Sequence, residues 1–490
     1  MKPTTLAYLK SNLLHLEQKM LKAVADRETM LATLPAQQQL SGENLLHYLT
    51  LRNEDIRDLQ DELHTAGLSS LASSESHILR QIQSVLQLIG VKKQAHELSK
   101  CDALTGRKAI QQHSNQLFGN KTNPAIPHIM VTFDTEFATN ERKVHQLLAA
   151  GMNVARINCA HDNADTWLKM IGNIQKAREK TGLPCKIYMD LAGPKIRTQI
   201  LGKGHKKGKA DFSDERTFFL AESNEVLDTE QIVIGCTQEG IVSQLKVGER
   251  VLFDDGLFEA KVEQLKKGLA RLQMVRISTK KPKLKAEKGI NFPDSTFTLD
   301  SLTEEDRAVL PFALQHADLI GYSFVRTAGD LQILQEALLK LKTNRPLPSI
   351  ILKIETPEAV KNLPGLLLQG MTQAGIGVMI ARGDLAVEIG FERMSEIQEE
   401  ILWICEAAHV PVIWATQVLE SLNKSGIATR SEVTDAAHAA LAECVMINKG
   451  DHTLQVIETL KDILLRSGGH HVKKTYSMRA LGIASRYMAG

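Results

Sequence analysis

A lysine and two carboxylates stand at or just beyond the ends of short apolar runs in the second half of the chain. Lys353 and Glu355 are two residues apart at the end of the run 349–355, so on a strand their side chains point to the same side. A buried lysine beside a carboxylate is costly unless the pair faces a polar opening. Glu355 and Asp384, which follows the run 377–382, offer two hard oxygen ligands suited to Mg²⁺ or Mn²⁺, with coordination positions left for substrate oxygens.

Three cations could converge with such a metal on one multiply charged anion. They are Arg156, Arg197 and Lys353. Phosphoryl transfer needs such a set of cations and metal ligands, because its catalysis consists mostly of positioning the substrates and neutralising their charge. The other polar residues near the ends of apolar runs are Asn158, Asp190, Ser323, Arg326 and Thr416. The alternative is that these groups form structural ion pairs that only satisfy one another.

Eight short apolar runs alternate with helical patterns from about residue 126 onward. Such runs, apolar on both faces, are typical of strands in a parallel sheet that helices cover on both sides. The runs are 128–134, 153–160, 186–191, 319–325, 349–355, 377–382, 410–416 and 444–449. Eight β/α units predict an α/β fold, a (β/α)8 TIM barrel, whose active sites lie at the C-terminal ends of the strands.

The remaining segments predict three additions to the barrel. Residues 1–125 show apolar residues at helical spacing and no cluster of catalytic types, so we expect a helical extension that docks on a neighbouring domain or subunit. Residues 199–290 alternate apolar and polar residues between glycine-rich turns, which predicts a small antiparallel, β-barrel-like lid inserted into the barrel. The barrel then comprises 126–198 and 291–470, and 471–490 is a C-terminal tail.

Composition excludes several classes of protein. The net charge is +2, with 59 basic and 57 acidic residues, and aromatic residues make up 4% of the chain. These values argue against a nucleic-acid partner or a membrane-surface partner. No apolar run reaches the length of a spanning helix, the N-terminus lacks a secretion signal, and the six cysteines are scattered. We therefore expect a cytoplasmic protein.

Several segments together resemble the pyruvate kinase family. In order and spacing they are GMNVARINCAH, MDLAGPKIRT, DDGLF, EKGINFPD, SFVRTAGD, LKIETPEAV, ARGDLAVEI and ATQVLESL followed by TRSEVTDAA. The resemblance covers roughly residues 126 to 450 and includes the inserted lid. It implies a kinase that moves phosphate from phosphoenolpyruvate to ADP or another nucleoside diphosphate, giving pyruvate and ATP.

The resemblance also implies a role for each matching residue. Lys353 would stabilise the phosphoryl group in flight, and Arg156 and Arg197 would contact phosphates. Glu355 and Asp384 would hold the divalent metal, Mg²⁺ or Mn²⁺. Gly383, Asp384 and Ser323 would bind the substrate, and Thr416 would relay the proton to the enolate through water. Asn158, His161 and Lys288 would lie on the nucleotide side.

One departure from the family concerns its monovalent cation. Many members bind K⁺ through an Asn, a Ser, an Asp and a Thr, with a Glu nearby in a GPE motif. Asn158 and Asp190 match, but Ala160 and Leu191 replace the Ser and the Thr, and Lys195 replaces the Glu. This pattern resembles the K⁺-independent branch, in which Lys195 would supply the positive charge. The alternative is a surface lysine without that role.

Three further departures lie elsewhere in the chain. Residues 132–137 place Asp134 and Glu136 where the family contacts the nucleotide. The stretch 447–451 lacks a glutamate of the active-site rim, and only about 25 residues follow Leu465, so we expect the regulatory domain and its effector site to be absent.

Three functions are compatible with these residues. The leading one is an atypical pyruvate kinase that forms a homo-oligomer. The second is a metal-dependent enolpyruvate enzyme with another acceptor, and the third is a non-catalytic metabolite sensor.

Overall fold

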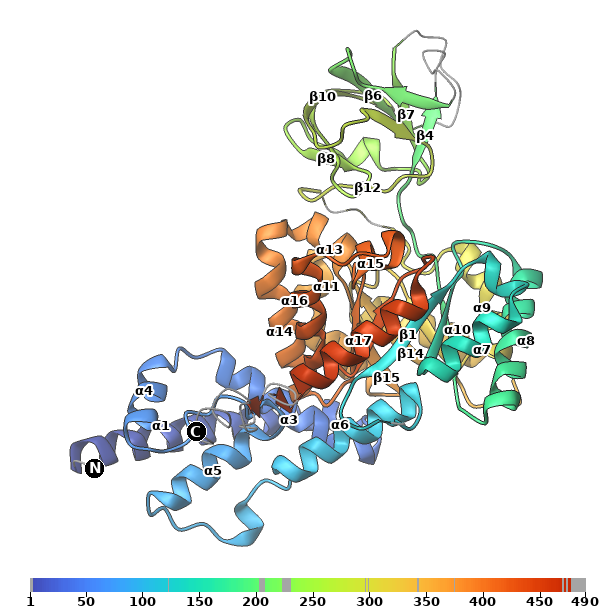
Figure 1. Ribbon diagram of the computed structural model, residues 1–490. Coiled ribbons are helices and arrows are strands. Elements are labelled where there is room, and N and C mark those ends of the chain that lie inside the picture. The colour runs from blue at the N-terminus through green and yellow to red at the C-terminus, as the bar shows by residue number, and fades with distance from the viewer. Residues whose placement is uncertain are drawn as a thin grey trace, which may run out of the picture.

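The computed structural model describes residues 3–121, 123–201, 208–222, 231–295, 297, 299–341, 343–373, 375–468, 471–472 and 475–476. The protein has three parts arranged along its long axis. The lid lies at one end, the barrel in the middle and the N-terminal helices at the other end (Figure 1). The predicted combination of a barrel, an inserted β-domain and a helical extension is confirmed.

The barrel is closed by eight parallel strands in the order β1-β17-β16-β15-β14-β13-β3-β2. Their bounds are β1 His128–Phe133, β2 Val154–Asn158, β3 Lys186–Asp190, β13 Leu319–Tyr322, β14 Ser349–Ile354, β15 Ile376–Ala381, β16 Val412–Ala415 and β17 Cys444–Ile447. Each of these strands lies within a predicted run or begins one residue before it. β1 and β15 are buried at every position, as expected for strands packed on both faces.

Helices surround the barrel, and many of them begin at a side-chain cap. They are α7 Glu141–Ala150, α8 Ala164–Thr181, α9 Glu304–His316, α10 Ala328–Lys340, α11 Pro357–Lys361, α12 Leu363–Gly370, α13 Arg382–Ile389, α14 Met394–Ala407, α15 Glu420–Ser425, α16 Arg430–His438 and α17 Thr453–Gly468. Asn140, Asn163, Thr303, Thr327 and Thr429 each accept a backbone N–H at a helix start. These caps satisfy donors that the first helical turn leaves unpaired.

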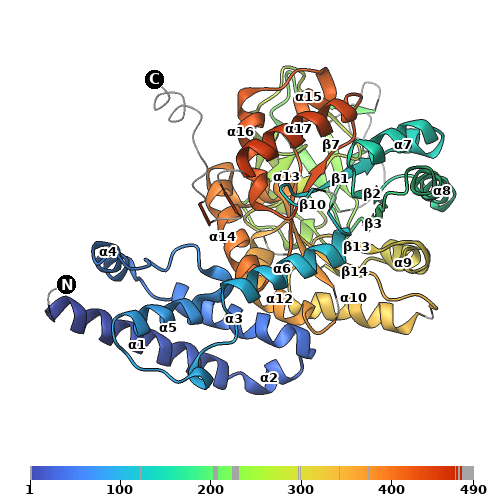
Figure 2. The same cartoon turned by 60° about the horizontal axis from the view of Figure 1, so that its bottom comes forward.

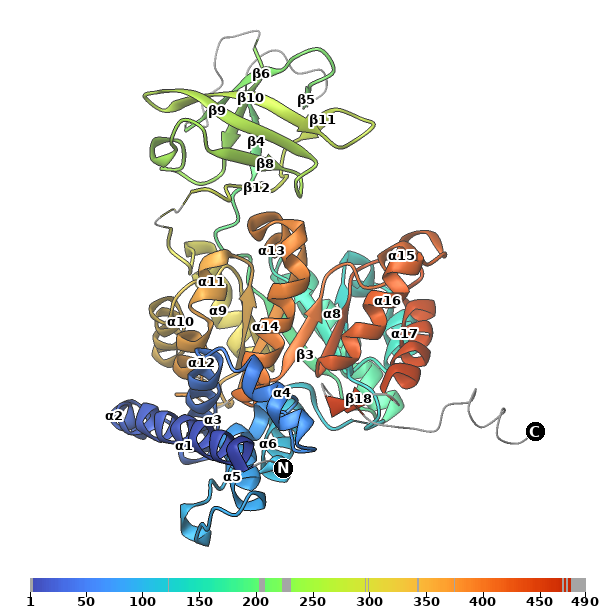
Figure 3. The ribbon, with the colours of Figure 1, turned by 90° about the vertical axis from the view of Figure 1, so that its left-hand side faces the viewer.

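The lid is built on a seven-stranded sheet in the order β12-β8-β9-β10-β6-β7-β4. Its strands are β4 Thr198–Leu201, β6 Thr217–Ala221, β7 Val233–Cys236, β8 Arg250–Phe253, β9 Phe258–Lys266, β10 Leu269–Ile277 and β12 Ile290–Asn291, and β5 Lys209–Asp211 pairs with β11 Lys283–Lys285. The sheet is antiparallel except for the parallel pair of β6 and β7. Figure 3 shows the lid above one end of the barrel.

The N-terminal segment consists of α1 Pro3–Ala25, α2 Glu28–Ala32, α3 Ala36–Arg52, α4 Arg57–Thr65, α5 Ile78–Leu88 and α6 Ala103–Phe118. Ile78, Ile82, Val85 and Leu86 recur at helical spacing along α5, and all four are buried. Seen from the end opposite the lid, α6 runs across the barrel (Figure 2). Beyond α17, β18 His471–Val472 pairs with β19 Thr475–Tyr476, and the rest of the predicted tail lies outside the described residues.

Asn44 joins the N-terminal helices to the barrel. Its side-chain amide donates to the carbonyls of Glu75 and Ala407, each at 2.8 Å, and its side-chain oxygen accepts the N–H of Ile78 at 3.2 Å. The residue is 1% exposed. One side chain therefore satisfies three backbone groups, one of which belongs to α14 of the barrel.

We expect Asn44→Ala to lower the free energy of unfolding by about 2 kcal/mol, because it leaves buried backbone groups without partners. The measurement is the midpoint of urea denaturation followed by tryptophan fluorescence. Asn12→Ala is the matched control, since Asn12 makes one exposed bond within α1. Equal midpoints for the two variants would contradict the docking role of Asn44.

Candidate active site

Lys353 lies at the centre of a charged cluster at the C-terminal ends of the barrel strands. Its ammonium donates to Ser323 Oγ at 2.5 Å and lies 3.4 Å from Asp190 Oδ1 and 3.2 Å from Glu355 Oε1. Ser323 Oγ in turn donates to the carbonyl of Leu191 at 2.6 Å. The strand ends of β3, β13 and β14 thus bring together residues that are more than 150 positions apart in the chain.

Asp190 is fully buried and forms ion pairs with two cations, Arg156 and Lys353. Arg156 donates to its Oδ2 through Nε at 2.8 Å and Nη2 at 2.6 Å, and the Tyr188 hydroxyl donates to Oδ1 at 3.2 Å. Burial alone would raise the pKa of Asp190, but Lys353 and Arg156 together bring it below its usual value. Likewise, burial disfavours the charged ammonium of Lys353, yet Asp190 and Glu355 raise its pKa. These shifts favour the charged forms of Asp190 and Lys353.

Two glycines make room for these side chains. A side chain at Gly321 would collide with the hydroxyl of Tyr188 and the carboxylate of Asp190 on the neighbouring strand. Gly193 has φ +67°, and a Cβ there would lie 2.8 Å from Ser323 Cβ. The loop after β3 can therefore approach Ser323 only with glycine at position 193.

Glu355 is the first of the two expected metal ligands. Its Oε1 faces Lys353, and its Oε2 accepts the backbone N–H of Phe324 at 2.7 Å. Burial raises the pKa of Glu355, and the negative charge of Asp384 adds to this rise. A divalent cation between the two carboxylates would relieve that repulsion. Two carboxylates fit Mg²⁺, which commonly takes one or two protein carboxylates and fills its other positions with water and phosphate oxygens.

Asp384, the second carboxylate, already has a cationic partner. Its Oδ1 accepts from the ammonium of Lys195 at 2.5 Å. The ammonium of Lys195 therefore lies beside one of the two expected metal ligands. Asp255, in the turn after β8 of the lid, lies close enough for Lys195 to lower its pKa, although burial raises that pKa more. The lid consequently brings a third carboxylate toward Lys195 and Asp384.

Thr416 is held by the first turn of α13. Its hydroxyl oxygen accepts the backbone N–H of Gly383 at 2.9 Å, and its backbone has φ +65°. Arg382 stabilises this strained loop by donating to the carbonyls of Ala415 and Thr416 while it forms an ion pair with Asp435. The hydroxyl of Thr416 is thus fixed beside the start of the helix, where backbone N–H groups favour an anion.

The three expected nucleotide-side residues have different surroundings, and His161 is the one that lies near other cations. His161 has a lowered pKa, because burial and the positive charges of Lys449 and Arg197 disfavour the imidazolium. Arg197 donates to the carbonyl of Glu287 at 3.1 Å, and Lys288 pairs with Asp254 of the lid at 2.7 Å. The side chain of Asn158 accepts the N–H of Ala160 at 3.2 Å.

The two acidic residues that follow β1, Asp134 and Glu136, interact with neighbouring residues in the chain. Asp134 accepts the N–H of Glu136 at 3.0 Å, and Glu136 pairs with Lys143 at 2.7 Å. The positive charge of Lys143 therefore offsets part of the repulsion that an acidic pair would exert on a diphosphate.

Arg326, the remaining cation near a strand end, takes no part in the cluster. Its guanidinium donates to the backbone carbonyls of Phe297 and Leu299, and it lies 3.7 Å from Asp330.

Sequence reasoning missed several residues that hold the site. Asp306 accepts the backbone N–H groups of Ala192 at 3.0 Å and Gly193 at 3.1 Å, which fixes the loop that carries Lys195. Asp435 anchors Arg382, and the positive charge of Lys449 helps to lower the pKa of His161. Arg382 and Asp435 both lie in the segments ARGDL and TRSEVTDAA, but spacing alone does not reveal that they pair.

Glu388 of α13 connects the barrel to the lid and titrates near neutrality. Its Oε1 accepts from Asn291 of β12 at 2.7 Å. Burial raises its pKa from 4.5 to about 7. The folded protein therefore keeps a proton that the unfolded chain releases above about pH 4.5, so the stabilisation is present below that pH and is lost as the pH rises through 7.

We expect Glu388→Gln to remove this pH dependence, because glutamine cannot ionise. Between pH 5 and pH 8 the wild type should lose on the order of 2 kcal/mol relative to the variant. The measurement is thermal unfolding at both pH values. Glu304→Gln is the control, since that side chain is 92% exposed. Parallel pH profiles for wild type and Glu388→Gln would contradict the shifted pKa.

Among the residues that the structure describes, no helix is both long enough and apolar enough to cross a membrane.

Comparisons with known proteins match the barrel. The family model "Pyruvate kinase, barrel domain" matches residues 127–453. A pyruvate kinase of Geobacillus stearothermophilus is 34% identical over 332 residues, which cover 66% of this chain and 54% of the relative. Pyruvate kinases of Bacillus licheniformis and Staphylococcus aureus (strain USA300) are 33% and 30% identical with the same coverage. The chain thus spans about half the length of the curated relatives it matches. Because the matched segment is more than half of the chain, the chain belongs to the pyruvate kinase family.

Proposed function

We propose that the protein transfers the phosphoryl group of phosphoenolpyruvate to ADP, or to another nucleoside diphosphate, with Mg²⁺ or Mn²⁺. The observation that carries this proposal is the buried ammonium of Lys353, which lies within 3.4 Å of Asp190 and Glu355 at the C-terminal end of the barrel. Burying a charged lysine costs free energy, so its presence at this position indicates a functional role. Neutralising the negative charge of a phosphoryl group during transfer is such a role.

The reaction breaks the bond between phosphorus and the enol oxygen and forms one to a terminal oxygen of the diphosphate. Lys353 offsets negative charge on the phosphoryl group, and Arg156 keeps Asp190 ionised so that Lys353 stays charged and in place. Arg197, beside His161, adds positive charge on the nucleotide side. The products of this step are the nucleoside triphosphate and the enolate of pyruvate.

Glu355 and Asp384 would hold the divalent metal. When bound, the metal neutralises charge on the phosphoryl and enolate oxygens. Ser323 orients Lys353, and Lys195 orients Asp384.

The enolate then takes a proton at its terminal carbon to give pyruvate. Thr416 has a hydroxyl fixed by Gly383, and it passes the proton through water because an alcohol is too weak an acid by itself. The start of α13 at Gly383 and Asp384 receives the substrate carboxylate. Asn158, His161 and Lys288 bind the nucleotide, with Lys288 supplied by the lid.

Lys195 takes over the function of a monovalent cation. Its ammonium supplies a fixed positive charge 2.5 Å from Asp384. A lysine held in this way needs no ion from solution, so the reaction proceeds without K⁺.

We expect Lys353→Met to lower the rate of pyruvate formation by at least 10³-fold, because methionine fills similar space without the charge that the transition state needs. The assay follows pyruvate release from phosphoenolpyruvate and ADP with Mg²⁺. Lys22→Met, in the exposed part of α1, is the control and should keep full activity. Activity retained by Lys353→Met would exclude this lysine as the phosphoryl-binding group.

We expect the wild-type rate to change less than twofold when K⁺ is replaced by tetramethylammonium at equal ionic strength. Lys195→Met should slow the reaction at least tenfold, since Asp384 then lacks its fixed cation. Initial rates with both salts provide the measurement. A wild-type enzyme that requires K⁺ would refute the role given to Lys195 while leaving the kinase assignment intact.

A further inference from the structure

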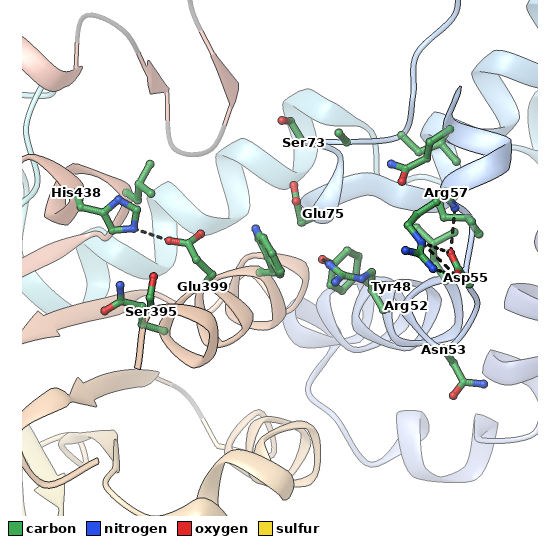
Figure 4. Close-up of a pocket in the computed structure, with 18 of the residues that line it drawn as sticks. Tyr48, Arg52, Asn53, Asp55, Arg57, Ser73, Glu75, Ser395, Glu399 and His438 are labelled. Carbon is green, nitrogen blue, oxygen red and sulfur yellow. Dashed lines mark hydrogen bonds and ion pairs between the residues drawn. The ribbon is translucent and has the colours of Figure 1, made fainter. Parts of the chain in front are cut away.

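A cavity of about 1520 Å³ lies between the N-terminal helices and the outer face of the barrel, away from the strand ends described above. Tyr48 and Arg52 of α3 line one side, and Glu399, Trp403 and Asp435 of the barrel helices line the other. Figure 4 shows Glu75 between these two walls. The cavity is far larger than a single water, whose share of liquid volume is about 30 Å³.

Glu75 is nine-tenths buried in this cavity, and its Oε2 has no hydrogen-bond partner among the described residues. A buried carboxylate oxygen without a donor costs free energy that a bound donor would recover. The other four carboxylates of the lining are already paired: Glu54 with Lys19, Asp55 with Arg57, Glu399 with His438 and Asp435 with Arg382. Glu75 is therefore the acceptor that the cavity leaves for a ligand.

The charges around the cavity favour a cation. Four of the five lining carboxylates are paired with a basic side chain, so the negative charge of Glu75 is the one left to attract a cation. Arg57 is bound to Asp55, and Arg52 donates to the hydroxyl of Tyr48 at 2.8 Å while its guanidinium stacks 4.7 Å from the ring of Trp403. A ligand with a positively charged N–H donor would form a charge-assisted bond to Glu75, which is stronger than a neutral one.

The lining also favours an organic ligand over a metal ion. Leu51, Ile56 and Leu71 add apolar surface beside Trp403. Pockets of this composition bind molecules that bury a carbon skeleton while a few polar groups fix the orientation. Within the described parts of the chain, no group of three or more His, Cys, Asp or Glu residues is arranged to hold a metal ion.

We propose that this cavity binds a small organic ammonium ion, with its N–H donated to Glu75 and its carbon chain against the apolar wall. The site is separate from the phosphoryl-transfer site and does not rest on the proposed function.

Binding can be measured without turnover, because two of the three tryptophans report on the cavity. Trp403 lines it, and the ring of Trp414 lies 5.2 Å from the ring of His438 in the cavity wall. Trp167 packs instead against Phe312. The experiment titrates the full-length protein with n-butylammonium chloride and follows tryptophan fluorescence, with sodium chloride as the ionic-strength control and n-butanol as the neutral probe of similar shape.

We expect saturable binding of n-butylammonium, at least tenfold weaker binding of n-butanol, and at least tenfold weaker ammonium binding by Glu75→Gln. Glu304→Gln, an exposed change elsewhere, should bind as the wild type does. If Glu75→Gln does not fold, as judged by circular dichroism, Ser395→Phe, which narrows the cavity from α14, should weaken binding instead. Absence of saturable binding to the wild type, or equal binding by wild type and Glu75→Gln, would overturn the proposal.

Discussion

The buried carboxylate of Asp190 holds the active-site charges in place. It sits among parallel strands, bound by Arg156 and Tyr188 and within 3.4 Å of Lys353. Removing one partner of a buried ion pair leaves an uncompensated charge, which costs several kcal/mol. Lys353 therefore depends on Asp190 for its charged state, and both Arg156 and Lys353 depend on it for their position. The glycine at position 321 is part of the same constraint, because any side chain there would occupy the space of this carboxylate.

Some charges of the candidate site are fixed within the barrel, and others are carried by the inserted domain. Lys353, Glu355 and Ser323 are fixed by bonds within the barrel wall. Lys288 and Asp255, in contrast, come from the inserted domain. A substrate that binds at the strand ends would thus meet preorganised charges first, and groups carried by the lid would complete its surroundings. Glu388 and Asn291 form a contact between barrel and lid whose charge changes near neutral pH.

Local patterns were enough to predict the eight strands, the helical extension and the inserted β-domain. They also predicted that Lys353 and Glu355 face the same side, because alternate residues of a strand share a face. The residues that contact these side chains could not be predicted from local sequence patterns. That Asp190 contacts both Arg156 and Lys353 depends on the register of neighbouring strands, and that Lys195 reaches Asp384 depends on the loop held by Asp306. The cavity around Glu75 could not be foreseen either, since it forms only where the extension docks on α14 and α16.

We propose that the site passes the phosphoryl group of phosphoenolpyruvate to a nucleoside diphosphate. Phosphorus NMR of the full-length protein with phosphoenolpyruvate, ADP and Mg²⁺ tests it directly, because it shows where the phosphorus goes. We expect the phosphoenolpyruvate signal to be replaced by the γ-phosphate signal of ATP, and we expect Lys353→Met to prevent this change. Release of inorganic phosphate with ADP unchanged, or a phosphoenolpyruvate signal that persists with ADP, GDP and UDP alike, would contradict it.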